Sequence, residues 1–366
     1  MKTQEKQPRE PLFHVVKRDA MPIWQSMLIR VAAVVLALLI CSILSILMIG
    51  ANPLEFIETL FTGTFGSGRR LWKFAKDAAV LLCISLAVTP AFRMRFWNIG
   101  AEGQTLIGAL ASVIVIMYLG NSVPNAALLP IMLLASLLAG AVFGGLPAIF
   151  KAIWGTNETL FTLMMNYVAS GLVAFFLIIW VPENGSVLGR LSTGFLPVIF
   201  HEYLLIIVAA LILAALVYVY LHYTKQGYEI SVVGESENTA HYIGINVKKV
   251  IIRTMLISGA ICGLAGFLIV GALDHSITAT TVGGMGFTAI MVSWLAKFNP
   301  LVMIGTSALV TFLQQGGSQI STNFTVDSSF PSMIVGIVLF FIIGCEFFIG
   351  YRLKFRGFRK ERSDEA

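Results

Sequence analysis

The chain has 366 residues, of which 57% are hydrophobic and 12% are charged, and its mean hydropathy is +0.85. Ordinary soluble domains have about 45–50% apolar and about 25% charged residues, so this composition excludes a soluble globular protein and predicts an all-α, polytopic membrane protein. A helix needs about 20 residues to cross a bilayer core, which leaves room for about ten spans and for no large extramembrane domain. The net charge of +6 does not indicate a nucleic-acid partner, because the positions of the basic residues account for it.

Hydropathy predicts ten transmembrane helices in chain order. They cover residues 28–50, 77–92, 103–119, 126–150, 159–181, 202–222, 250–272, 284–297, 300–320 and 331–350. The membrane domain therefore runs over 28–350, between an N-terminal segment, 1–27, and a basic tail, 351–366. No small-residue cleavage site precedes the first helix, so we expect it to be an uncleaved anchor.

The basic residues predict the orientation of these helices. With an even number of spans, 20 of the 25 Lys and Arg residues fall on the side that holds both termini. The positive-inside tendency then places both termini in the cytoplasm. Four of the five exceptions cluster after the first span, at Arg69, Arg70, Lys73 and Lys76, where we expect an interfacial helix whose basic side chains snorkel.

Two helices are expected to be broken, near residues 98–104 and 283–297. The spans 77–92 and 284–297 are short, and both adjoin glycine-rich segments. Paired interruptions of this kind are typical of the substrate path of transporters built from repeats, whereas close packing through small residues is the alternative. The first segment also contains Glu102, and a carboxylate at membrane depth costs about 2.5–3.5 kcal/mol, which indicates transport.

Polar and aromatic residues near these breaks are candidates for the substrate path. Amides pair with donors and acceptors alike, whereas a carboxylate pairs only with donors. The carboxylates could instead pair with Arg93, Arg95 or Lys151, and the aromatic rings could be packing residues. The candidates are Asn98, Glu102, Gln104, Asn157, Glu158 and Asn166, with Phe96 and Trp97 as rings that could stack on a base.

The remaining chemistry is sparse. The four cysteines stand apart in apolar segments, with neither a Cys-x-x-Cys spacing nor a histidine pair at metal-ligand spacing, so we expect packing residues and no metal site. No pairing of a nucleophile with a base is found, and we expect no catalytic residue.

The longest connection between spans, about 223–250, is expected to hold a short helix. Ser236 suits its N-cap, Tyr242 lies near its end, and Gly244 is a natural stop. Apolar residues in this segment would be exposed in a solvated loop, so docking to a partner is the favoured interpretation.

Four segments give a specific resemblance. They are Phe96–Gln104, Asn157–Ala169, Val233–Asn238 with Tyr242–Asn246, and Gly284–Ile290. They resemble the permease subunits of ABC importers in the branched-chain amino acid and simple-sugar group, most closely the nucleoside branch and the longer of its two permeases. The similar motifs run from about residue 90 to 350.

The resemblance implies a subunit of an ATP-driven importer in a bacterial plasma membrane that passes nucleosides, with purine nucleosides expected, by alternating access. The implied partners are an ABC ATPase, a second, homologous permease in a heterodimer, and an external substrate-binding lipoprotein. The chain contains no P-loop sequence, so it should need no cofactor of its own, and ATP and Mg²⁺ would be bound and hydrolysed by the ATPase. The alternatives are a simple sugar or a branched-chain amino acid as cargo, or a proton-coupled secondary transporter with Glu102 or Glu158 as proton carrier.

The resemblance also assigns the connection 223–250 to coupling with the ATPase. The family usually has arginine at the position of His241. The residues implied to couple are Gly234, Glu235, Ala240, His241, Gly244 and Ile245.

Overall fold

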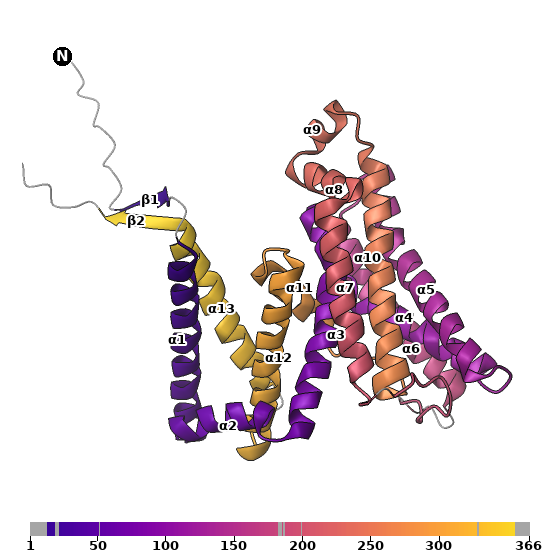
Figure 1. The fold of residues 1–366 in the computed structure, drawn as a ribbon, viewed down its shortest axis with the longest axis horizontal. Coiled ribbons are helices and arrows are strands. Elements are labelled where there is room, and N and C mark those ends of the chain that lie inside the picture. Colours follow the sequence, from indigo (N-terminus) through magenta and orange to yellow (C-terminus); the bar gives the residue numbers. More distant parts are fainter. Residues whose placement is uncertain are drawn as a thin grey trace, which may run out of the picture. The chain divides into compact units, whose positions relative to one another are not determined.

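A computed structural model describes residues 13–18, 22–50, 52–181, 185, 187–198, 200–327 and 329–355. The described chain is almost wholly helical, which confirms the all-α prediction, and it divides into two compact units, Met1–Phe61 with Gly316–Ala366 and Thr62–Gln315 (Figure 1). The boundary between the units falls within two helices, α2 (Pro53–Phe65) and α12 (Pro300–Asn323). Parts of the predicted terminal segments, 1–12 and 356–366, lie outside the described residues.

The first unit pairs the two ends of the described chain. Helix α1 (Ile23–Ile49) packs on α13 (Phe330–Gly350), and strand β1 (Phe13–Lys17) pairs antiparallel with β2 (Tyr351–Phe355). An ion pair of 2.6 Å between Arg30 Nη2 and a Glu346 carboxylate oxygen also joins α1 to α13. The strand pair was not predicted. It places the start of α1 and the end of α13 on one side, as an even number of spans requires.

The second unit is a helical bundle built around α10. Its helices are α3 (Gly68–Arg93), α4 (Ala101–Leu119), α5 (Asn125–Trp154), α6 (Glu158–Trp180), α7 (Leu204–Tyr223), α8 (Lys225–Glu235), α9 (Glu237–Tyr242), α10 (Val247–Ile269) with a π-helical end, η2 (Val270–Asp274), and α11 (Met285–Leu295). Helix α10 packs against α3, α4 and α5, and α8 and α9 follow the C-terminal end of α7, with α8 beside the N-terminal end of α10 (Figure 1).

Each of the ten predicted spans coincides with a helix. Eight helices of the described chain are long and apolar enough to cross a membrane. The other two are α11, which is apolar but has only 11 residues, and α12, whose 24 residues include a polar second half. The short α11 confirms the broken helix predicted near 283–297.

The expectation of an interfacial helix over Arg69–Lys76 was wrong. These residues form the first turns of α3, which Ser67 caps by accepting a hydrogen bond from the Arg70 amide at 3.3 Å. The Arg70 guanidinium in turn donates to the Thr62 carbonyl at 2.8 Å. The predicted span 77–92 is therefore part of a longer helix, α3. The four basic residues occupy the first turns of α3, where long basic side chains can reach water while the helix continues without a break.

Helices α5 and α10 meet through glycine. Gly140 and Gly144 on α5 face Gly259 and Gly263 on α10, and each pair has the four-residue spacing that lets membrane helices approach closely. A Cβ atom added at Gly259 would collide with the Gly140 carbonyl, and one at Gly263 with the Ser136 carbonyl. The backbones of the two helices are therefore in direct contact.

Candidate functional site

The segment between α3 and α4 is non-helical, and its centre is a buried pair of amides. Asn98 and Gln104 are 0% and 1% exposed. They hydrogen-bond reciprocally, from Asn98 Nδ2 to Gln104 Oε1 at 3.3 Å and from Gln104 Nε2 to Asn98 Oδ1 at 3.1 Å. Asn98 Nδ2 also lies 3.4 Å from the Ser258 hydroxyl on α10, and its Oδ1 accepts from the Gly100 amide at 3.0 Å. The pair therefore links the break to the central helix.

Helix α6 supplies partners for the backbone of the same segment. Asn166 accepts a hydrogen bond from the Gly103 amide at 2.8 Å and donates one to the Ile99 carbonyl at 3.0 Å. The Thr162 hydroxyl accepts from the Ile99 amide at 3.1 Å. Irregular backbone at membrane depth needs such internal partners, so α6 stabilises the break.

Glu102 joins the two broken segments directly. Its two carboxylate oxygens accept hydrogen bonds from the amides of Gly284, at 2.8 Å, and Gly286, at 2.7 Å, at the start of α11. Free amides and the helix dipole make an N-terminus a favourable place for a carboxylate. A Cβ atom at Gly286 would collide with the Glu102 backbone, so only glycine permits this approach. Glu102 thus bonds backbone amides and forms no ion pair with Arg93 or Arg95.

The two candidates at the start of α6 are close to the helix surface. Asn157 caps α6 by accepting from the Leu160 amide at 3.1 Å. Glu158 forms a 2.8 Å ion pair with Lys151, one of the basic partners that the sequence offered for this carboxylate. A shallow cavity of about 440 Å³ opens beside them, lined by Asn157, Leu160, Phe161, Met164, Met165 and Val168.

The two aromatic candidates differ in exposure. Phe96 is 3% exposed and belongs to the core, whereas Trp97 is 47% exposed. The Trp97 ring lies 5.6 Å from that of Trp294 on α11, measured between centroids. Of the two, only Trp97 presents a face that a ligand could reach.

The predicted short helix of the coupling segment is present as α9. Ser236 caps it by accepting from the Thr239 amide at 3.2 Å, and Gly244 stops it with a φ of 82°. Ala240 is fully buried, whereas Tyr242 is 92% and Ile243 50% exposed. The segment thus presents an aromatic and an aliphatic side chain outward from the bundle. The preceding helix, α8, was not predicted.

The other residues of this segment divide between packing and surface. Gly234 is buried, and a Cβ atom there would collide with the Arg93 carbonyl at the end of α3. Ile245 is half-buried and donates its amide to the Ala240 carbonyl at 2.9 Å. Glu235 and His241 are exposed. The segment is therefore seated on α3 through Gly234 and open on its outer face.

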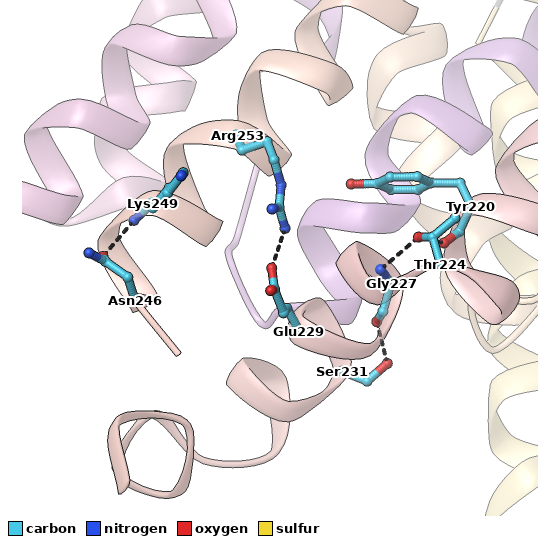
Figure 2. Close-up of polar contacts among 8 residues, drawn as sticks. All are labelled: Tyr220, Thr224, Gly227, Glu229, Ser231, Asn246, Lys249 and Arg253. Atoms are coloured by element: carbon cyan, nitrogen blue, oxygen red, sulfur yellow. Dashed lines mark hydrogen bonds and ion pairs between the residues drawn. The ribbon is translucent and has the colours of Figure 1, made fainter. Parts of the chain in front are cut away.

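An ion pair ties α8 to α10. Arg253 Nη2 lies 2.9 Å from Glu229 Oε2, and Figure 2 shows the Tyr220 hydroxyl directed toward the same guanidinium. The side chains of Arg253 and Glu229 are 25% and 16% exposed. Thr224 caps α8 by accepting from the Gly227 amide at 3.1 Å (Figure 2). Helix α8 is thus fixed by a cap at its N-terminus and by an ion pair near its middle.

Sequence reasoning missed three parts of this arrangement. Ser258 and Thr162 are single hydroxyls in apolar helices, and no local pattern distinguishes them. The Glu229–Arg253 pair spans 24 residues and two helices, which no helical spacing reveals. The glycines at 259 and 263, by contrast, carry a readable four-residue spacing.

The fold and the eight long apolar helices of the described chain define a polytopic membrane protein. Residues 70–343 match the family described as the permease component of the branched-chain amino acid transport system, and the chain belongs to that family.

Individual relatives narrow the comparison. The chain is 29% identical over 356 residues, 92% of each protein, to the glucose ABC transporter permease protein TsgB13 of Haloferax volcanii. It is 29% identical over 328 residues, 87% of this chain and 92% of the relative, to the guanosine ABC transporter permease protein NupP of Bacillus subtilis. A second guanosine permease of that organism, NupQ, is 29% identical over 250 residues, 65% of this chain and 78% of its own.

Proposed function

We propose that this chain is a permease subunit of an ATP-driven importer that passes nucleosides, with purine nucleosides as the preferred class. The observation that carries the proposal is the similarity to the guanosine permease NupP over 92% of its length. A sugar is the second candidate, because the glucose permease TsgB13 is equally identical over 92% of each chain.

The ATPase partner would bind the outer face of α8 and α9. Tyr242 and Ile243 are exposed there, and apolar side chains at a helix turn outside the bundle suit a protein partner. The ATPase would bind ATP and Mg²⁺ and hydrolyse ATP, because this chain has no P-loop sequence. The positive-inside tendency would put this face, and both termini, in the cytoplasm.

The importer would further contain a second, distinct permease and an external substrate-binding lipoprotein. Two guanosine permeases of one organism, NupP and NupQ, both resemble this chain, which favours a heterodimer. The outer face of α6 could contact the second permease within the membrane, because its apolar residues Leu160, Met164 and Val168 are 57%, 54% and 49% exposed.

The substrate path would run beside the junction of the two broken segments. We propose that Trp97 stacks on the base and that Glu102, the exposed Asn157 and the half-buried Glu158 lie along the path. Asn98, Gln104 and Asn166 are hydrogen-bonded to protein groups and would contact cargo only if these bonds broke, and Phe96 is buried.

ATP-driven motion would reach the path through α10. Closure of the ATPase pair would move α8, and the Glu229–Arg253 ion pair would pass that movement to α10. Ser258 lies five residues further along α10, within hydrogen-bond distance of Asn98. A shift of α10 would thereby open the amide pair and turn the path from one side of the membrane to the other.

The direct test is uptake of radiolabelled guanosine by cells with and without this chain. Loss of uptake on deletion, with competition by unlabelled nucleosides and none by ribose, glucose or leucine, is the expected result. Unchanged nucleoside uptake with impaired sugar or leucine uptake would refute the cargo assignment. For the ATPase contact, deletion of residues 234–245 should abolish both uptake and co-purification of the ATPase, and normal recovery of the ATPase would refute the docking proposal.

A further inference from the structure

A cavity of about 320 Å³ lies between the C-terminal ends of α3 and α11 in the second unit. Its volume is in the range of small-molecule sites. The Trp97 and Trp294 rings lie 5.6 Å apart, and those of Trp294 and Phe298 5.3 Å apart, so the rings form one continuous wall. The lining combines four aromatic rings with two guanidinium groups, from Phe92, Arg93, Arg95, Trp97, Trp294 and Phe298.

The two guanidinium groups are available to a ligand. Neither Arg93 nor Arg95 makes an ion pair or a side-chain hydrogen bond with another residue of the described chain. Arg95 is exposed and Arg93 half-buried. A guanidinium presents paired N–H donors that match a phosphate, so two beside one cavity suit an anionic group.

The position of the cavity, at the end of a membrane-spanning helix, favours a lipid as its ligand. Arg93 is the last residue of a helix long and apolar enough to span the membrane. Trp97 and Trp294 are 47% and 46% exposed beside it, and exposed tryptophan at a helix end marks the membrane–water boundary. Basic pockets between membrane helices at this depth bind lipid head groups.

We propose that this cavity binds the head group of an anionic phospholipid. Arg93 and Arg95 contact the phosphate, and the indole ring of Trp294 covers the glycerol and the start of an acyl chain. The site adjoins the coupling segment, because Gly234 of α8 packs on the Arg93 carbonyl. The inference does not depend on the cargo.

Native mass spectrometry of the purified full-length chain tests the proposal. The protein is mixed with equal amounts of palmitoyl-oleoyl phosphatidylglycerol and phosphatidylcholine, and we expect one phosphatidylglycerol to be retained in preference. One surface cation contributes about fivefold to binding an anionic lipid surface, so the double variant R93Q/R95Q should bind phosphatidylglycerol about 30-fold more weakly. The matched control R69Q/K73Q removes two cations from the other end of α3 and should bind like the unmodified protein.

Four results would overturn the proposal. Equal retention by R93Q/R95Q and the unmodified protein would place the lipid elsewhere, and equal retention of phosphatidylcholine would remove the role of charge. Displacement of the lipid by millimolar inorganic phosphate would identify a free-phosphate site. If R93Q/R95Q keeps the lipid but no longer co-purifies with the ATPase, the two arginines belong to a protein interface.

Discussion

Replacing Glu229 by Gln should separate ATP hydrolysis from cargo movement. The change removes the charge that pairs with Arg253 across 2.9 Å and leaves a guanidinium whose Nε is already buried without a hydrogen-bond partner. Exposed ion pairs contribute about 0–1 kcal/mol, and removing one partner of a buried pair costs about 3–5 kcal/mol. With side chains 25% and 16% exposed, the pair lies between these limits, and we expect a cost of about 2 kcal/mol.

A loss of about 2 kcal/mol weakens the seating of α8 on α10 by about 30-fold. Guanosine uptake should therefore fall at least tenfold, while ATP hydrolysis by the assembled transporter in detergent continues. The assay is uptake and ATPase activity side by side, together with the thermal unfolding midpoint. In a double-mutant cycle with Arg253→Gln, the two single losses should exceed the loss of the double variant by at least 1 kcal/mol.

The matched control is Glu58→Gln, which removes an exposed carboxylate from α2, outside the proposed ATPase face. It should leave uptake and unfolding unchanged, and the charge swap E229R/R253E should recover part of the uptake. Additive single losses, or equal uptake losses in E229Q and E58Q, would refute the assignment of the pair as the link between α8 and α10.

Three further outcomes are expected. Gly259→Val should destabilise the bundle by about 3 kcal/mol, measured as a lower unfolding midpoint, because its side chain would enter the α5 backbone; Gly171→Ala, with open space at its Cβ, should have little effect. Glu102→Ala should leave two amides without an acceptor and cost about 3 kcal/mol, seen as faster hydrogen exchange in the first turn of α11; unchanged exchange would contradict this role. Burial lowers the pKa of His275 below its ordinary 6.5, so the folded protein favours the neutral imidazole. The free energy of unfolding should therefore decrease as the pH falls below about 6.5, because the unfolded chain binds the proton more readily. His275→Gln should show a smaller fall in the unfolding midpoint between about pH 7 and about pH 5.

The order of the helices could be predicted because hydropathy is local. A polar segment with glycines inside an apolar run predicted the break at 98–104, and the cap at Ser236 with the stop at Gly244 predicted α9. Charge was misleading at Arg69–Lys76, because basic residues at the end of a long helix resemble a separate amphipathic segment. A capping serine at 67 was the signal that the helix begins earlier.

The partners of the candidate residues could not be predicted in the same way. Asn98 meets Ser258, which is 160 residues away in the sequence, and the contact depends on how α10 packs. The sequence predicts that Glu102 contacts cargo or pairs with an arginine, but its partners are the backbone amides of Gly284 and Gly286. Backbone donors carry no residue type, so no inspection of side chains reveals them.

The glycine contact between α5 and α10 determines where the bundle can deform. Side chains between two helices can change rotamer and let the helices slide, but the backbones of Gly140 and Gly259 have no intervening atoms that could rearrange. We therefore expect α5 and α10 to move together as one rigid body. Conformational change within the bundle would then occur in its non-helical segments, around Asn98 and at Gly283 and Gly284 before α11.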